Sequence, residues 1–351
     1  MTVGVFDHPV LAGLLGDESL YELFTVEAEL AAMLAFEVAL AQAQAAFELI
    51  PNEAADAIAR LPSGFAPDVV LLRQAIGSDG VVIPELVRQW REALGEHAPH
   101  VHFGATSQDA IDTGLMLRLK PALSLIAQRL LNLIAELAAL KQRHGHVQLM
   151  GRTRMQAALP ILAGDRIASW QDPLADLDAR LRAFRETGLP LQLGGAVGTL
   201  EKLGDKAAEI RADVARRLEL ADHSQWHSQR TVIADLGHLV SLITGSLGKF
   251  GQDIALMADN GSVRLSGGGA SSAMPHKRNP VKAEVLVTLA RFNAVQLSGL
   301  HHSLVHEQER SGAAWTLEWM ILPQMVVACG GALKLGLDLA QSIESMGDAG
   351  H

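Results

Sequence analysis

The sequence predicts an all-α protein built on a bundle of long helices, and two observations support this. Hydrophobic residues make up 49% of the chain and aromatic residues only 4%, a balance that favours helices packed through small and straight-chain residues over β-sandwiches. In addition, three segments repeat apolar residues at alternating spacings of three and four, the pattern of a helix packed lengthwise against others. The 351 residues are enough for one large domain or two moderate ones.

The predicted helices are long. Apolar seams extend over residues 119–140, 167–184 and 233–257, and two further helices are expected from about residue 281 to 306 and from about 314 to 342. Helices well beyond the average of about 11 or 12 residues are stable only when neighbours cover their flanks. So much apolar helix surface exceeds what a monomer leaves exposed, which predicts a closed symmetric oligomer.

The first third of the chain has a different pattern, with shorter helices and frequent turns. Four prolines interrupt it, namely Pro51, Pro62, Pro67 and Pro84. We therefore expect a small N-terminal helical domain over residues 1–105 and the long-helix bundle over residues 106–351. Two Gly-rich segments, 188–199 and 266–280, are too irregular for helix interior and are candidate functional loops.

The charge excludes some classes of partner. The net charge of −10, from 39 acidic and 29 basic side chains, argues against binding to nucleic acid or to an anionic membrane. The single cysteine, Cys329, excludes an intrachain disulfide, and the N-terminus carries Asp7 and no basic segment before its apolar residues. No apolar stretch reaches about 18 residues without interruption by charged or strongly polar groups. We expect a soluble, cytoplasmic protein.

The most informative segment is GGGASSAMPHKRNP, in which Ser271 and Ser272 follow three glycines and precede Met274, Lys277 and Asn279. Glycines provide mobility and free backbone amides, and a serine hydroxyl can transfer a proton. Lysine and asparagine side chains suit a carboxylate. The segment therefore predicts an anion-binding loop that can close, although a surface loop with solvated charges is the usual interpretation of an arbitrary Gly/Ser/Lys stretch.

A second segment, HFGATSQDAIDTG, places His102, Thr106, Ser107 and Asp109 at a turn that enters the first long helix. Hydroxyl groups and the amides of a helix N-terminus can bind an anion there. Helix capping alone would explain the threonine, the serine and the aspartate. His102, Thr106 and Ser107 are therefore candidate substrate-binding residues, with capping as the alternative.

A third segment, MGRTRMQAALP, holds Arg152, Thr153, Arg154 and Gln156 as candidate substrate-binding residues. Arginine cannot transfer a proton near neutral pH, but it binds carboxylates with two hydrogen bonds.

Further candidates lie nearer the C-terminus. They are Gln229 and Arg230 in WHSQR, and Arg310 in HEQERSGAAWTLEW, where Glu309 is expected to orient the arginine. With Arg152, Arg154 and Lys277, these arginines concentrate positive charge as a polycarboxylate substrate requires, unless they form scattered salt bridges instead.

These segments resemble the signatures GSSxMPxKxNP, GxTSxDxxDT and GRTHxQxAxP of the fumarase/aspartase superfamily, and the resemblance extends over nearly the whole chain. It implies a homotetramer of long-helix bundles with sites shared among three subunits and without a cofactor. It also implies that Ser271 is catalytic, with Ser272 the next candidate. It implies that Thr106 and Ser107 contact substrate oxyanions and that Lys277 and Asn279 bind a carboxylate. Ala270 stands where the signature usually has glycine, and Arg154 where it has histidine.

The arginine at position 154 narrows the activity that the resemblance implies. In several lyases of the superfamily the histidine protonates the departing nitrogen or oxygen, so its loss argues against an ordinary amine-releasing lyase. Cycloisomerases of the muconate type also replace it, because an attacking carboxylate is already ionised, and WHSQR and HEQERSGAAWTLEW resemble them too. The C-terminal helical domain of adenylosuccinate and argininosuccinate lyases is expected to be largely absent. An adenylosuccinate-type lyase, a sulfomuconate cycloisomerase and a catalytically silent structural homologue stay open as alternatives.

Metal and nucleotide sites are not expected. His100 and His102 form a His-x-His pair, as do His144 and His146, but no third and fourth ligand stands at a recognisable spacing. The segment GGAVGT lacks the preceding β-strand that a dinucleotide site requires.

Overall fold

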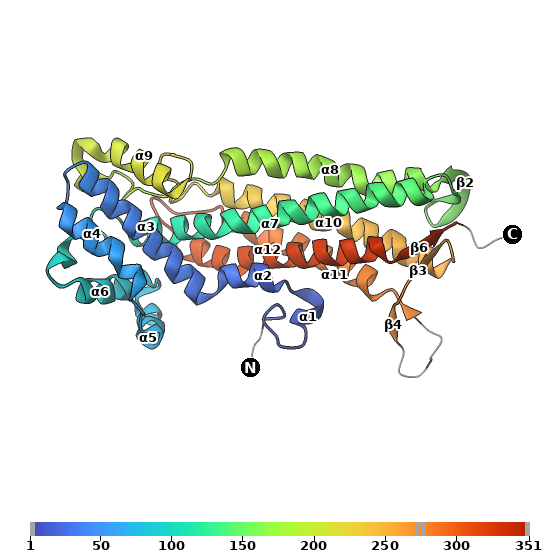
Figure 1. The fold of residues 1–351 in the computed structure, drawn as a ribbon, viewed down its shortest axis with the longest axis horizontal. Coiled ribbons are helices and arrows are strands. Elements are labelled where there is room, and N and C mark those ends of the chain that lie inside the picture. Colours follow the sequence, from blue (N-terminus) through green and yellow to red (C-terminus); the bar gives the residue numbers. More distant parts are fainter. Residues whose placement is uncertain (1–3, 271–273, 275–277, 348–351) are drawn as a thin grey trace.

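Five long helices lie side by side in an extended rod, and the N-terminal helices gather at one end of it (Figure 1). The computed structural model describes residues 4–270, 274 and 278–347. The five helices of the rod are α7 (Ser107–His144), α8 (Ala163–Thr187), α10 (Thr231–Asp259), α11 (Val281–His302) and α12 (Gly312–Gln341). The predicted long-helix bundle is therefore confirmed.

The predicted apolar seams form the core of this rod. Seven residues of α7 are completely buried, namely Leu119, Leu123, Ile126, Leu130, Leu133, Leu137 and Leu140. The seam of α10 from Ile233 to Met257 is at most 4% exposed, and Trp170 of α8 packs its ring against Phe250 of α10 at 5.0 Å. Each helix is thus held by apolar contacts along most of its length.

Helices α10 and α11 approach each other closely because two glycines of α10 face α11. A Cβ on Gly248 would lie 2.5 Å from the Cβ of Ala290, and one on Gly251 would lie 2.6 Å from the carbonyl oxygen of Ala283. Any larger side chain would push the two helices apart.

Three helices, α7, α10 and α12, are long and apolar enough to cross a membrane by length and composition alone, with mean hydropathies of 1.5, 1.3 and 1.5. Charged residues such as Arg129, Asp235 and Lys334 interrupt these helices, so the expectation that no uninterrupted apolar stretch reaches about 18 residues is not contradicted. The apolar side chains have another use, since 39%, 56% and 67% of the three windows are buried inside the chain itself.

From residue 4 to the start of α7 the structure describes six α-helices. They are α1 (Ala12–Leu15), α2 (Glu18–Tyr21), α3 (Val26–Ala46), α4 (Asn52–Arg60), α5 (Val69–Asp79) and α6 (Ile83–Leu94). Short 3₁₀ segments lie there at Glu22–Phe24, Leu61–Ser63 and Gly95–His100, and another follows α8 at Glu201–Lys206. Most of these helices are short, as expected, but α3 has 21 residues and packs along both α7 and α9 (Ala207–Leu218). A separate domain over residues 1–105 remains a prediction.

Within the described part of the chain, three antiparallel strand pairs depart from a purely helical fold. These are β1 (Gln148–Thr153) with β2 (Gln156–Leu162), β3 (Val263–Leu265) with β6 (Ile343–Met346), and β4 (Gly269–Ala270) with β5 (Arg278–Asn279). All three pairs involve segments that connect or follow the long helices. Their local backbone pairing does not produce the apolar periodicity on which the prediction was based.

The helix expected to reach residue 306 ends at His302. Residues 303–311 form an irregular segment in which Gln308 has a positive φ of 47°. Ser311 caps the start of α12, because its hydroxyl oxygen accepts a hydrogen bond from the amide of Ala314. This connection carries Arg310 back to the start of α7.

Candidate active site

A buried carboxylate fixes the start of α7. Asp109 has no exposed surface and accepts hydrogen bonds from the backbone amides of Thr106 at 3.0 Å and of Gly194 and Gly195 at 2.9 Å. It therefore ties the helix start to the Gly-rich segment 188–199, a capping role rather than a binding one. The hydroxyl of Ser107 has no hydrogen-bond partner among the described residues and remains available to a ligand.

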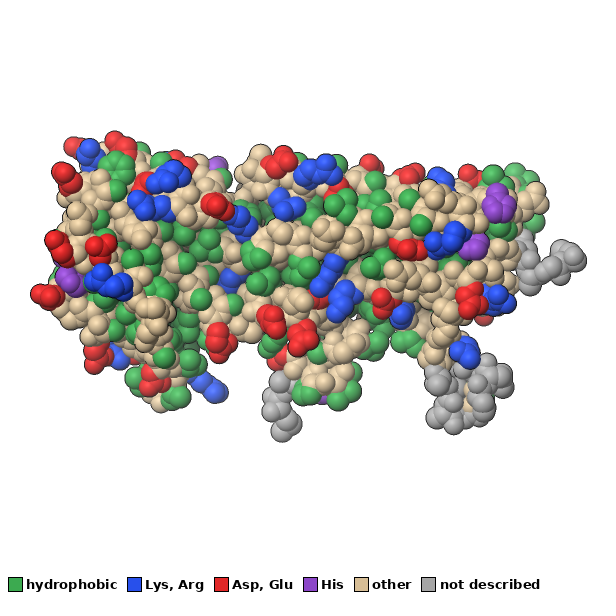
Figure 2. Space-filling model, viewed as in Figure 1, with side chains coloured by type: hydrophobic (Ala, Val, Ile, Leu, Met, Phe, Trp, Pro, Cys, Tyr) green, Lys and Arg blue, Asp and Glu red, His purple; other side chains and the backbone are tan. Residues whose placement is uncertain are grey.

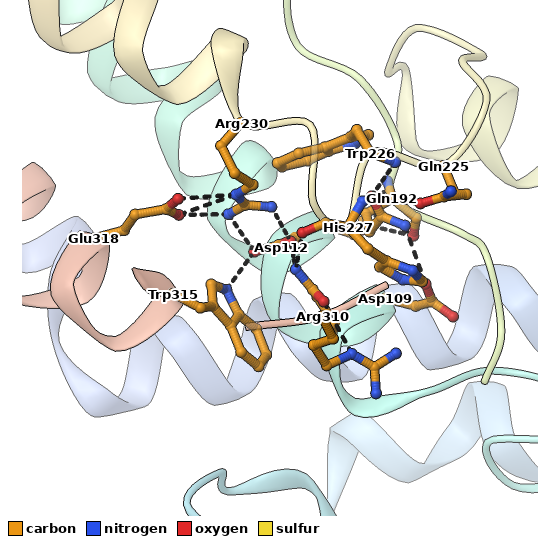
Figure 3. Close-up of polar contacts among 12 residues, drawn as sticks. Asp109, Asp112, Gln192, Gln225, Trp226, His227, Arg230, Arg310, Trp315 and Glu318 are labelled. Atoms are coloured by element: carbon orange, nitrogen blue, oxygen red, sulfur yellow. Dashed lines mark hydrogen bonds and ion pairs between the residues drawn. The ribbon is translucent and has the colours of Figure 1, made fainter. Parts of the chain in front are cut away.

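Behind this helix start lies a completely buried ionic cluster (Figure 3). The guanidinium of Arg230 donates to both carboxylate oxygens of Asp112, at 2.5 and 3.1 Å, and to Glu318, at 2.9, 3.2 and 2.5 Å. Burial alone would lower the pKa of Arg230, but the two carboxylates outweigh it and raise the pKa. The expectation that Arg230 supplies free positive charge to a substrate is therefore not met, because both of its partners belong to the protein.

Arg310 reaches the same helix start from the segment between α11 and α12. Its Nε donates to Oε1 of Gln108 at 3.0 Å, and its Nη2 donates to the carbonyl oxygen of Ala196 at 3.1 Å. The side chain is exposed beyond these two contacts. Glu309 makes no ion pair with Arg310 within the described part of the chain, so the glutamine, and not the neighbouring glutamate, orients the guanidinium.

His102 is held close to the same helix start by α3. Glu37 accepts a hydrogen bond from the backbone amide of His102 at 3.0 Å, and its other oxygen lies 2.5 Å from Nδ1 of the ring. Burial would lower the pKa of His102, but the charge of Glu37 and its hydrogen bond, with a smaller effect of Asp109, raise the pKa. The backbone of His102 has a φ of 58°, a conformation that this carboxylate clamp holds.

The third predicted segment forms an exposed β-hairpin. Strands β1 and β2 pair Thr153 with Gln156, which leaves Arg154 and Met155 as a two-residue turn with φ angles of 49° and 67°. Positive φ at both positions is typical of a type I′ turn, which usually contains asparagine and glycine. The strained turn holds Arg154 at the tip of the hairpin, and Arg152 is exposed on the strand before it.

A cavity of about 610 Å³ lies beside this hairpin. Its lining includes Arg152 and Arg154 from the hairpin, Arg166 from α8 and Lys249 from α10. Lys249 is paired with Asp253, whereas the three arginines make no ion pair with any described residue. The hairpin thus presents cationic groups to a hollow large enough for a small anion.

The serine-bearing segment starts and ends at the short pair of strands β4 and β5. Gly269 pairs with Asn279 and Ala270 with Arg278, so these residues lie side by side. Gly267, Gly268 and Asn279 line a hollow of about 500 Å³. Met274 is exposed. Ser271, Ser272 and Lys277 lie outside the described residues.

A single chain brings together only part of the predicted site. Five of the predicted residues belong to elements that meet at the start of α7, namely Thr106, Ser107, His102, Gln229 and Arg310. The hairpin that carries Arg154 follows the end of the same helix, and 38 residues at about 1.5 Å each separate the two ends by about 57 Å. Figure 1 places β4 apart from both.

Several polar residues of this region were not identified from the sequence. Gln108, Asp112, His227 and Glu318 are at most 1% exposed and hydrogen-bonded to one another or to Arg230 and Asp109. The available signal was the polar pair Gln108 and Asp112, one helical turn apart on α7. Their partners are far away in the sequence, in the segment that leads into α10 and on α12. Among the described residues no group of three or more His, Cys, Asp or Glu could hold a metal ion.

Comparisons with known proteins agree with this architecture. A family model described as a lyase matches residues 16–295, which is most of the chain. The chain therefore belongs to this lyase family of the fumarase/aspartase superfamily.

The relatives narrow the comparison to particular enzymes. The chain is 37% identical over 332 residues to the 3-carboxy-cis,cis-muconate cycloisomerase of Pseudomonas aeruginosa, covering 92% of this chain and 72% of the relative. It is similar to the crystal structure of a 3-carboxy-cis,cis-muconate lactonizing enzyme from Pseudomonas putida, with a TM-score of 0.91, 36% identity and coverage of 96% and 77%. A nitrosuccinate lyase of Streptomyces davaonensis is 35% identical over 332 residues, covering 88% of this chain and 69% of the relative.

Proposed function

We propose that this chain is an enzyme that converts 3-carboxy-cis,cis-muconate to 4-carboxymuconolactone, a step in protocatechuate breakdown through the β-ketoadipate pathway. The observation that carries the proposal is Arg154 at the hairpin tip, in a chain whose fold and sequence are similar to those of lactonizing enzymes. An arginine there can hold a carboxylate but cannot protonate a departing amine. This suits a reaction in which the attacking oxygen is already ionised.

The reaction needs one proton and no electron donor. A carboxylate oxygen of the substrate forms a C–O bond to one alkene carbon, and the alkene electron pair moves to the carbon beside another carboxyl group. Ser271, or Ser272 if the first serine is not the donor, supplies the proton to that carbon. Lys277 and Asn279 stabilise the enolate-like intermediate. The chemistry requires no cofactor.

The remaining carboxylates of the substrate are assigned to the other two segments. Ser107 and the amides at the start of α7 suit one carboxylate, and Arg310 lies beside them. Arg154 suits another. Arg152, Thr153, Gln156, Gln229 and Met274 are proposed to contact the substrate more peripherally.

A homotetramer with sites shared among three subunits is part of the proposal. The separation of about 57 Å between the two ends of α7 supports it, because no small substrate spans that distance within one chain. Exposed apolar side chains also support it, including Met155 at 69% and Leu159 at 74% on the hairpin. Figure 2 shows hydrophobic side chains between the charged ones on the visible face. We further propose that the enzyme is soluble and works in the cytoplasm.

The direct test is to follow the loss of the ultraviolet absorbance of 3-carboxy-cis,cis-muconate with the purified protein. The variant Ser271→Ala should lose turnover while its helical circular-dichroism signal is unchanged. Ser78→Ala, at an exposed position on α5, is the matched control and should keep full activity. Full activity of Ser271→Ala would show that another residue donates the proton, and Ser272 would be the next candidate.

Parallel assays separate the alternatives. Release of fumarate from adenylosuccinate would indicate an adenylosuccinate-type lyase. Faster turnover of 3-sulfomuconate than of 3-carboxy-cis,cis-muconate would indicate a sulfomuconate cycloisomerase. A catalytically silent homologue would turn over none of these compounds, and that result would refute the proposed function.

Mixing two inactive variants tests whether the sites are shared. Ser271→Ala and Arg310→Gln alter elements that lie apart in one chain (Figure 1). If Ser271 of one subunit and Arg310 of another meet in one site, dissociation and reassembly of an equal mixture of the two variants should restore about a quarter of the sites. No recovery in a reassembled tetramer would contradict the shared site.

A further inference from the structure

We propose that Gln108 is a positioning residue that orients Arg310 toward the substrate, and that the buried Arg230 cluster fixes the orientation of Gln108 in turn. The inference rests on the proposed function, because it takes Arg310 as a ligand of a substrate carboxylate. Gln108, Asp112 and Arg230 lie behind Arg310, and none of them needs to touch the substrate.

The two acceptors that face the Gln108 amide nitrogen determine the orientation of the amide. Its Nε2 donates to Oδ2 of Asp112 at 3.1 Å and to the carbonyl oxygen of His227 at 2.8 Å. Both partners are acceptors only, so the nitrogen must face them and Oε1 must face the opposite way. That oxygen accepts the hydrogen bond from Nε of Arg310 at 3.0 Å.

Asp112 in turn cannot rotate. Arg230 binds both of its oxygens, and the indole Nε1 of Trp315 donates to Oδ1 at 3.0 Å (Figure 3). The aspartate, the arginine and Gln108 are each at most 1% exposed. A rigid, buried relay thus extends from α10 and α12 through α7 to the exposed guanidinium of Arg310.

Two contacts set the plane of that guanidinium. Nε meets Gln108, and Nη2 meets the carbonyl oxygen of Ala196. Nη1 has no partner among the described residues, and the exposed side of the group is free to bind a carboxylate. Because Arg310 lies on an irregular segment rather than on a helix, these two contacts supply the orientation that its backbone does not.

A purely structural role for Gln108 is the alternative. A buried glutamine could serve only to satisfy Asp112 and the carbonyl group of His227. Its loss would then lower stability without a specific effect on substrate affinity. The two roles are separated by measuring binding and stability together.

The experiment replaces Gln108 with methionine, which has a similar volume and no amide. The readouts are KM and kcat for 3-carboxy-cis,cis-muconate, the Kd for tricarballylate by calorimetry, and Tm. We expect Gln108→Met to raise KM and Kd about tenfold with kcat changed less than about threefold. Gln128→Met, at an exposed glutamine of the same helix, is the matched control and should change neither constant.

A double-mutant cycle identifies Arg310 as the residue through which Gln108 acts. In an Arg310→Gln background, Gln108→Met should raise Kd by less than about twofold, whereas its effect on Tm should persist. Equal effects on Kd in both backgrounds would overturn the inference.

Arg310→Lys supplies a second test that does not depend on the folding of a core variant. Lysine keeps the charge but lacks the Nε–H group that Gln108 accepts, so Kd should rise nearly as much as with Arg310→Gln. A lysine variant with wild-type Kd would overturn the inference, because charge alone would then suffice. An unchanged Kd in Arg310→Gln would overturn it as well. Absence of muconate turnover in the wild type, with these Kd effects intact, would instead remove only the proposed function.

Discussion

The buried ionic cluster gives the sharpest prediction about stability. Replacing Arg230 with methionine would leave Asp112 and Glu318 in a dry interior without their counter-ion. Removing one partner of a buried ion pair costs about 3–5 kcal/mol. Since this arginine makes five contacts to two carboxylates, we expect the upper end, about 5 kcal/mol.

The assay is urea unfolding followed by circular dichroism at one fixed protein concentration, because oligomer dissociation would otherwise change the apparent stability. Arg264→Met is the matched control. It removes an ion pair with Glu344 in which both side chains are exposed, and it should cost less than about 1 kcal/mol. Neutralising both carboxylates as well, in a triple variant with Asp112→Asn and Glu318→Gln, should recover part of the loss. If Arg230→Met were no less stable than the control, the cluster would not be the desolvated ion pair described above.

Three further predictions follow from single residues. Leu130→Ala should lower the free energy of unfolding by about 3 kcal/mol because the side chain is completely buried. Leu131→Ala, at a position that is 45% exposed, should lower it by less than about 1 kcal/mol. Equal losses would contradict the burial of the apolar seam of α7. The pKa of His102 is raised in the folded protein, so its stabilisation is complete below the unfolded value of about 6.5 and is lost as pH rises through the folded value. The stability difference between wild type and His102→Asn, measured by urea unfolding, should therefore shrink from about pH 6 to about pH 9, and a difference that grows with pH would refute the pairing with Glu37. Burial raises the pKa of the Cys329 thiol to about 12, so only about one molecule in a thousand carries a thiolate at pH 9; iodoacetamide should label the unfolded chain and spare the native one.

The helices of the bundle were the most predictable part of the fold. Their seams repeat over many turns, and each buried position, such as Leu130 or Ile243, adds to the same periodic signal. The short strands carried no such signal, because pairs such as β4 and β5 contain two residues each. The end of α11 at His302 was also missed, since the apolar residues Leu304 and Val305 continue the pattern beyond the helix.

The candidate site was predictable in its segments and not in its contacts. The sequence pointed to Arg310 and Arg230 as one group of cations. The structure exposes Arg310 and neutralises Arg230 with two carboxylates. The difference arises from Glu318, which is 88 residues away in sequence from Arg230 and can be recognised as its partner only once α10 and α12 are packed together.

The sequence by itself determined the long helices and the family, because periodic burial and contiguous motifs are local properties of the chain. Tertiary packing decided which polar groups are satisfied by the protein and which remain for a ligand. Asp109 became a helix anchor, Arg230 a buried counter-ion and Gln108 the contact of Arg310. The physical reason is that a polar group shut away from water must find its partners wherever the fold brings them, irrespective of their distance along the chain.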